Sequence, residues 1–122
     1  MSNLVVSNIS DGTTSVGTGY VVNGSAKAWA ANVLDAATSQ DTLNVSSITD
    51  TGTGDNRINL SSSMNYSNYV VTSMVTATSS IDARNISLYD NPASSYRVYT
   101  TVSSTGAVSG YGSHTSAFGD LA

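Results

Sequence analysis

Few residues of this sequence could do chemistry, and the first candidates are two aspartates in the segment 50–55 (DTGTGD). Asp50 and Asp55 could in principle be ligands of a calcium loop or the paired carboxylates of a glycosidase. An EF-hand loop ends in a bidentate Glu, and the sequence contains no Glu. Glycoside cleavage needs two carboxyl groups at a controlled separation, and nothing in the sequence identifies such a pair. The alternating residues on both sides instead predict a hairpin turn made by Asp50, Gly52, Gly54 and Asp55.

His114 is the only histidine of the chain, and this limits the catalytic chemistry that the sequence can support. A metal site built on imidazoles needs more than one histidine. A Ser-His-Asp triad would have to use His114 without the GxSxG turn that presents the nucleophile in one large class of hydrolases. The absence of cysteine excludes disulfides and thiolate zinc sites. We therefore expect no enzymatic activity, no metal and no cofactor, and we expect residues 112–114 (GSH) to form an exposed polar loop.

Tyrosines are the residues best suited to binding, because a rigid ring with a polar tip can stack on a sugar or contact a protein. Tyrosines on strands also commonly fill a core, so both interpretations stay open. The binding interpretation selects Tyr96 and Tyr99, which bracket Arg97 on an alternating strand where Tyr99 and Arg97 share one side. Tyr111 and His114 follow in the most Gly-rich segment. The predicted receptor-binding set is therefore Tyr96, Tyr99, Tyr111 and His114.

Strands, not long helices, must position these residues. Ser, Thr and Asn make up about 40% of the 122 residues, and Lys occurs once, a composition that disfavours helix interiors. Period-two segments between Gly, Asn and Asp residues predict seven to eight short strands, which indicates an all-β fold, either an antiparallel β-sandwich or a barrel-like module. A phase shift at Ser46-Ser47 predicts a β-bulge. The expected strands are 4–9, a hairpin over 42–61, and 69–77, 84–89 and 96–102.

The first third of the sequence divides into an arm and the start of the main domain. Residues 13–19 (TTSVGTG) are rich in Gly and predict a flexible connector. We therefore expect residues 1–22 to form an N-terminal attachment arm and residues 23–122 to form the β-sandwich domain. Residues 25–37 (SAKAWAANVLDAA) fit two structures, because their Trp and Val spacing is helical whereas their alternating alanines fit a strand.

Charge and hydropathy argue against two classes of partner. The net charge is −4, and the basic residues do not form the patch that phosphate binding requires, so we expect no nucleic-acid partner. No apolar run approaches the roughly 18 residues of a membrane span. No cationic segment precedes an apolar run at the N-terminus. We therefore expect no membrane insertion and no secretion signal. The basic residues are Lys27, Arg57, Arg84 and Arg97.

Three motifs point to a known class of protein. They are SNISDGTTSVGTGYVVNGSAKAW (7–29), NVSSITDTGTGD (44–55) and the closing FGD (118–120). In this order and at this approximate spacing, the sequence resembles modules of tail-fibre and other virion appendage proteins of bacteriophages. The resemblance implies a β-domain that assembles as a homotrimer and meets the host cell surface. It also implies residence in the virion after assembly in the host cytoplasm.

Two functions remain open within this class. The first is a tail-fibre or tail-tip adhesin that recognises a host glycan or surface protein, and the motifs favour it. The second is a capsid decoration or head-fibre protein whose N-terminal arm pairs with another virion protein by strand addition, and the short length favours it. In both, the low charge and the thin aliphatic content favour burial of surface between copies, so we expect the chain to be its own partner.

Overall fold

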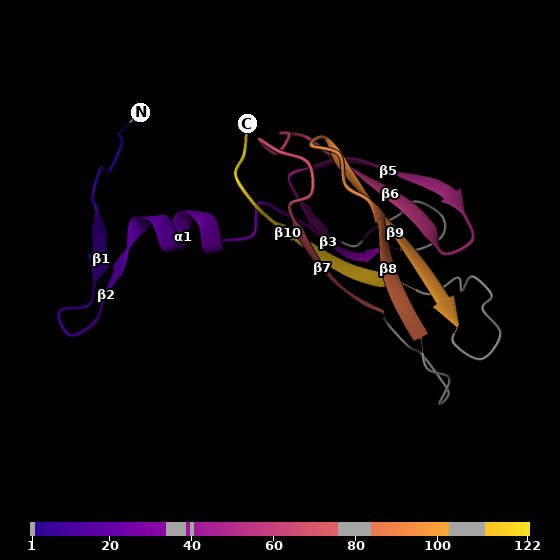
Figure 1. The fold of residues 1–122 in the computed structure, drawn as a ribbon, viewed down its shortest axis with the longest axis horizontal. Coiled ribbons are helices and arrows are strands. Elements are labelled where there is room, and N and C mark those ends of the chain that lie inside the picture. The colour runs from indigo at the N-terminus through magenta and orange to yellow at the C-terminus, as the bar shows by residue number, and fades with distance from the viewer. Residues whose placement is uncertain (1, 34–38, 40, 76–83, 103–111) are drawn as a thin grey trace.

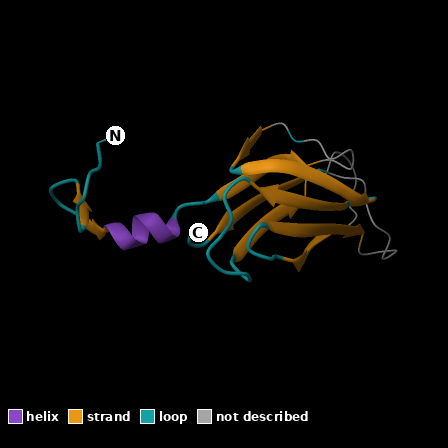
Figure 2. Cartoon of the chain, turned by 90° about the horizontal axis from the view of Figure 1, so that it is seen from above, coloured by secondary structure: helices purple, strands orange, loops and turns teal. Residues whose placement is uncertain are grey.

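The fold consists of a β-sandwich preceded by a small hairpin and one short helix. A computed structural model describes residues 2–33, 39, 41–75, 84–102 and 112–122. Two four-stranded antiparallel sheets pack face to face, as Figure 2 shows from above. The predicted all-β sandwich is confirmed, with eight strands in its two layers.

The first layer, which we call sheet 1, has the strand order β4-β3-β10-β7. The sequence of residues 25–37 fits both a helix and a strand. In the structure most of its described part is a strand, because β3 covers Ala28–Val33. Its alternation is clear, because Ala28 and Ala30 are buried while Trp29 between them is half-buried on the outer side. The other strands of sheet 1 are β4 (Asp41–Leu43), β7 (Val70–Val75) and β10 (Ser113–Phe118).

β10 lies at the centre of sheet 1, where the sequence predicted an exposed polar loop over 112–114, and that prediction is wrong. Ser113 and Thr115 point inward and are buried, whereas His114 points out. Thr115 Oγ1 and Tyr96 Oη of the opposite layer share a 2.8 Å hydrogen bond. The inward positions of β10 therefore include two small polar side chains, of which Thr115 is satisfied by this hydrogen bond, and apolar periodicity could not reveal the strand.

The second layer, sheet 2, has the strand order β5-β6-β9-β8. β5 (Val45–Gly52) and β6 (Asp55–Leu60) form the hairpin that the sequence predicted over 42–61. Its first residues were placed wrongly, because the strand breaks at Asn44, whose φ is 54°, and residues 42 and 43 belong to β4 of sheet 1. The pairing register shifts between Val45 and Ser47, so the predicted bulge is confirmed. The remaining strands of sheet 2 are β8 (Arg84–Asp90) and β9 (Ser95–Val102).

The β5-β6 turn uses backbone conformations that favour glycine. Gly52 has a φ of 149° and Gly54 a φ of 71°, both in the region that side chains with a Cβ atom avoid. Asp50 Oδ1 accepts a 2.9 Å hydrogen bond from the Gly52 amide, and Thr51 Oγ1 donates to the Asp55 carbonyl at 2.8 Å. Side chains next to the two glycines therefore fix the turn.

The hydrophobic core fills the space between the two layers and one end of the sandwich. Sheet 1 contributes the small alanines Ala28 and Ala117 to this core, and sheet 2 contributes larger side chains. Tyr69 and Tyr96 meet edge to face with their ring centroids 6.4 Å apart, and the Tyr69 hydroxyl donates to the Ser95 carbonyl at 2.7 Å. The buried cluster consists of Ala28, Ile58, Leu60, Met64, Tyr69, Tyr96, Val98 and Ala117.

Residues 2–24, which we call the arm, extend away from the sandwich (Figure 1). β1 (Asn8–Ser10) pairs with β2 (Ser15–Gly17), and α1 (Thr18–Gly24) follows directly. Residues 15–19 of the connector predicted over 13–19 form β2 and the start of α1. Within the described part of the chain, no helix is long and apolar enough to cross a membrane.

The strand predicted over 4–9 is also wrong for most of its length. Residues 4–7 lie outside any strand, and β1 begins only at Asn8. Leu4 and Val5 have the composition of a strand but no facing strand, and their side chains are exposed. A β-hairpin extends only as far as each strand has a partner to pair with. Local apolar composition therefore predicted a strand that begins too early in the chain.

Candidate functional site

The structure separates the residues that the sequence grouped as a receptor-binding set. Tyr96 is 0% exposed in the core, so its prediction as a receptor contact is wrong, because no ligand can reach it. Tyr99 is half-buried on the outer face of sheet 2, and His114 is exposed on the outer face of sheet 1. Tyr111 lies outside the described residues. Tyr99 and His114 therefore face opposite sides of the sandwich and cannot share one site.

Strand alternation explains why neighbouring tyrosines of β9 have different surroundings. Tyr96 and Val98 point into the core, while Arg97 and Tyr99 point out, as the sequence predicted for the shared side of Arg97 and Tyr99. Burial raises the pKa of Tyr96 to about 12, because the phenolate would lose its solvation, and the hydrogen bond with Thr115 opposes this shift. Tyr96 is therefore an uncharged structural residue.

Two ion pairs cover the outer face of sheet 2. Arg97 Nε donates to Asp55 Oδ1 at 2.7 Å, and Arg97 Nη2 donates to Asp55 Oδ2, so this pair is bidentate. Arg57 Nη2 lies 2.9 Å from Asp90 Oδ2, and Arg57 Nη1 donates to Ser95 Oγ at 2.9 Å. The register places Arg57 directly opposite Arg97. Two facing cations repel each other, and the carboxylate that each one holds offsets this repulsion.

The Asp55–Arg97 pair is charged at neutral pH. The hydrogen bond from Arg97 holds the pKa of Asp55 below its usual range, against the effect of burial. The same hydrogen bond raises the pKa of Arg97. Because the two charges compensate each other, the pair orients its donors and acceptors without adding net charge to the face.

An exposed aromatic ring completes this arrangement. The guanidinium carbon of Arg97 lies 4.5 Å from the centroid of the Tyr89 ring, within the range of a cation–π interaction. Tyr99 pairs directly with Asp55 in the β6-β9 register. We call the surface formed by Asp55, Tyr89, Arg97 and Tyr99 the aromatic–guanidinium face. Its side chains come from three neighbouring strands of a rigid sheet, so their positions are set before any ligand arrives.

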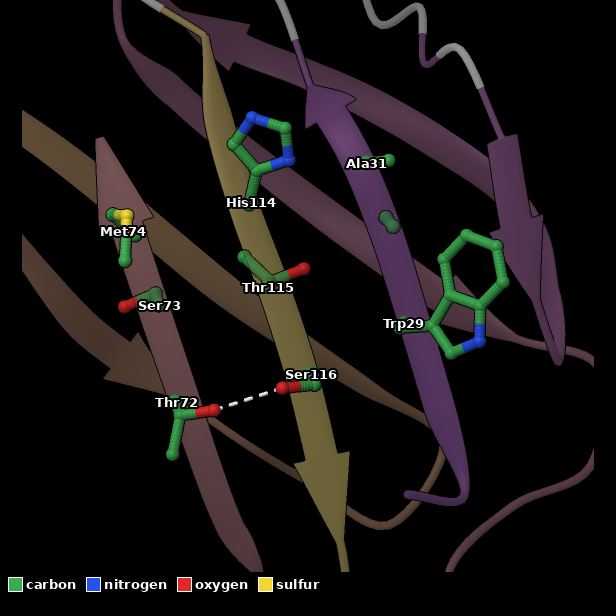
Figure 3. Close-up of a pocket in the computed structure, with 9 residues that line it drawn as sticks. Trp29, Ala31, Thr72, Ser73, Met74, His114, Thr115 and Ser116 are labelled. Carbon is green, nitrogen blue, oxygen red and sulfur yellow. Dashed lines mark hydrogen bonds between the residues drawn. The ribbon is translucent and has the colours of Figure 1, made fainter. Parts of the chain in front are cut away.

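The outer face of sheet 1 has a different character, shown in Figure 3. A hollow of about 370 Å³ opens beside Trp29, Met74 and His114. The hollow forms because the side chains of Ala31 and Ser116 are small. They lie among the larger side chains of Trp29, Met74 and His114. Further side chains at the hollow are Thr72, whose Oγ1 shares a 2.8 Å hydrogen bond with Ser116 Oγ, and Ser73.

Apolar side chains continue across this face beyond the hollow. Leu43 of β4 lies opposite Trp29, and Phe118 of β10 lies opposite Val70 of β7. Strand alternation puts Phe118 and Val70 on the same side of the sheet as His114 and Met74. We call the surface of Trp29, Leu43, Val70, Met74 and Phe118 the apolar face. Among the outward residues of sheet 1 that the structure describes, Asp41 is the one carboxylate, at the β4 edge.

The sequence alone does not reveal most of these neighbours. Trp29 and His114 are conspicuous residues, but their proximity depends on the pairing of β3 with β10, which lie far apart in the chain. Tyr89 lies at a register shift between Leu88 and Asp90, and such a shift redirects a side chain locally. The one signal available was the alternation in β9, which correctly placed Tyr99 beside Arg97.

Among the described residues, three surface features are candidates for binding: the aromatic–guanidinium face, the apolar face and the exposed arm. Within the residues that the structure describes, no three His, Cys, Asp or Glu side chains are grouped so that they could hold a metal ion. Comparison with known proteins adds no relative, because no family model, no curated protein and no solved structure matches the chain.

Proposed function

We propose that the chain is a non-enzymatic bacteriophage virion protein of the tail-fibre or tail-tip type. Its sandwich would recognise the host surface through the aromatic–guanidinium face. The motifs at 7–29 and 44–55 support the virion assignment. One observation supports recognition: Asp55 fixes Arg97 on one side, and the exposed ring of Tyr89 stacks on it. A ligand that meets this face finds its partners already ordered, so binding costs little side-chain entropy.

A host glycan is the ligand whose chemistry suits this face. The ring of Tyr89 offers a flat apolar surface with a hydroxyl at its tip. Asp55 and Arg97 hold acceptors and donors in fixed positions beside it, which suits the many hydroxyl groups of a sugar. Arg97 is paired with Asp55, and the neighbouring Arg57 is paired with Asp90, so the surface has little attraction for a polyanion.

A capsid decoration or head-fibre protein is the second candidate function, and the arm favours it. The arm has exposed apolar side chains and no core of its own. If it paired with another virion protein, it would anchor the sandwich and display it outward. This function makes the arm essential and the aromatic–guanidinium face dispensable, so the two candidates predict different effects of mutation.

Binding of the purified chain to cells of a bacterium that the phage infects tests the adhesin proposal. Tyr89 is 69% exposed and Tyr66, in the segment between β6 and β7, is 68% exposed, so Tyr66→Ser is a matched control for Tyr89→Ser. We expect saturable binding of the wild-type chain, a loss on the order of tenfold or more in affinity for Tyr89→Ser and Arg97→Gln, and no loss for Tyr66→Ser.

Thermal melts of all variants show whether lost binding reflects lost folding. Tyr89→Ser changes an exposed side chain, so its melt should stay close to that of the wild type. Absence of saturable binding by the wild-type chain would contradict the adhesin proposal. Equal losses for Tyr89→Ser and Tyr66→Ser would show that the recognition surface lies elsewhere.

A further inference from the structure

The arm is folded, yet it buries none of its large apolar side chains. Tyr20 of α1 is 80% exposed, and α1 contains no buried residue. A seven-residue helix and a hairpin of three-residue strands are each too short to be stable alone in water. The arm therefore needs a surface to pack against, and its own sandwich does not cover it (Figure 1). Its exposed apolar side chains are Leu4, Val5, Val6, Ile9, Val16, Tyr20, Val21 and Val22.

The apolar face of sheet 1 is the complementary uncovered surface. Met74 is 69% exposed there, and Val70 and Leu43 are also exposed. The outer face of sheet 2 is polar, as expected of a sheet that faces solvent. It carries the ion pairs of Arg57 and Arg97 and a network of polar side chains. The contrast between the two outer faces indicates that sheet 1 is covered in the assembled protein.

We propose that the arm of one copy packs on the apolar face of a second copy of this chain. Each copy supplies one uncovered arm and one uncovered apolar face, so the exchange covers both without any other protein. Charge permits the contact, because Asp11 is the one charged side chain of the arm and lies in its β1-β2 turn. On the apolar face, Asp41 lies at the β4 edge, so the two surfaces meet without burying a charge.

The hollow beside Trp29 gives this contact a defined anchoring point. It is open to solvent and bordered by Met74 and His114, so it can accept an aromatic side chain from the arm. Tyr20 is the aromatic residue of the arm, and an inserted tyrosine with a polar tip is a common anchor of protein interfaces. Arm and face are different patches, so the contact is heterologous, and a closed rotation of such contacts makes a ring such as a trimer.

This inference rests on the homotrimer that the resemblance to tail-fibre proteins implies for the proposed function, but not on host recognition. Its test measures only the mass of the assembly, so failure of the adhesin proposal and failure of this interface are distinguishable. Tyr20→Asp places a charge in the arm, and Met74→Asp places one on the apolar face. Tyr66→Asp is the matched control, because Tyr66 is 68% exposed, close to the 69% of Met74, and belongs to neither the arm nor the apolar face.

Light scattering at micromolar concentration gives the mass of each full-length variant. We expect three times the 12.5 kDa chain mass for the wild type and for Tyr66→Asp. We expect a single chain mass for Tyr20→Asp and for Met74→Asp, with the sandwich still melting cooperatively. A wild-type monomer would overturn the inference, and it is the result expected if the arm binds a different virion protein.

Mixing the two monomeric variants is the sharper test. Tyr20→Asp retains an intact apolar face and Met74→Asp retains an intact arm, so one good contact forms between them. We expect a 1:1 complex that neither variant makes alone. If Met74→Asp stays oligomeric by itself, or if the mixture stays monomeric, the arm does not pack on the apolar face and the inference is wrong.

Discussion

Tyr96 connects the two layers of the sandwich through one hydroxyl group. Its Oη and Thr115 Oγ1 share a 2.8 Å hydrogen bond inside the core. Tyr96→Phe keeps the ring but leaves the buried hydroxyl of Thr115 without this partner, and we expect a loss of about 1–2 kcal/mol in the free energy of unfolding. Chemical denaturation measures this loss. Tyr66→Phe removes a hydroxyl from an exposed ring and should change the free energy of unfolding very little.

The same residue makes stability depend on alkaline pH. The pKa of Tyr96 is raised to about 12 in the folded state, whereas an unfolded tyrosine titrates near 10. A raised pKa contributes stability that is present below pH 10 and is lost as the pH rises from 10 to 12. We expect the wild type to lose more stability than Tyr96→Phe over this interval. Parallel alkaline titrations of the two proteins would contradict the assignment of this pH dependence to Tyr96.

Gly119 is a second residue whose identity follows from contact. A Cβ atom at this position would lie 3.0 Å from the Cβ of Tyr69, and neither atom can move without the backbone. We expect Gly119→Ala to lower the free energy of unfolding by about 1–3 kcal/mol, the usual cost of overpacking. Gly19→Ala in α1 is the control, because a Cβ there meets nothing within 4 Å. A Gly119→Ala protein as stable as the wild type would show that the chain adapts here.

At the scale of elements, the β5-β6 hairpin is the part that the sequence predicted best. Both of its strands alternate, and its turn contains the glycines that the backbone requires. The same reasoning failed for β10, because Ser113 and Thr115 occupy inward positions. It also did not predict α1, because Tyr20 and its valine neighbours show no helical periodicity; with no facing strand, a helix satisfies their backbone locally. Local patterns therefore predicted elements with apolar inward residues and missed the others.

The hairpin turn can be tested as an element. Gly52→Val combined with Gly54→Val forces two β-branched residues into positive φ, and we expect a loss of about 2–4 kcal/mol from the usual cost per residue. Thr53→Val is the control, because it exchanges one β-branched residue for another between the two glycines. An unchanged melting temperature in the double variant would show that neither glycine needs its conformation.

The candidate site was predictable only in part, because its side chains come from different strands. Alternation within one strand placed Tyr99 beside Arg97. The contact of Arg97 with Tyr89 depends on the β8-β9 register and its irregularity, which no local pattern encodes. The hollow depends on the pairing of β3, β10 and β7, which are distant in sequence. Sites built across strands require the register, and the register comes from packing of the whole sandwich.

At the scale of the whole molecule, the surface divides into polar and apolar regions. The aromatic–guanidinium face is polar, ordered and compensated in charge, as a recognition surface should be. The apolar face and the arm are uncovered hydrophobic surfaces, as subunit interfaces are. The aromatic–guanidinium face and the apolar face lie on opposite layers of the sandwich. Assembly through the apolar face would therefore leave the aromatic–guanidinium face open to a host cell.

Labelling of phage particles with gold-conjugated antibodies against the purified chain, followed by electron microscopy, tests whether the protein is part of the phage tail. The measurement locates the protein without assuming which residues bind the host. We expect gold at the tail fibres or the tail tip. Gold spread over the capsid would contradict the adhesin assignment in favour of decoration, and particles without label would contradict a role in the virion altogether.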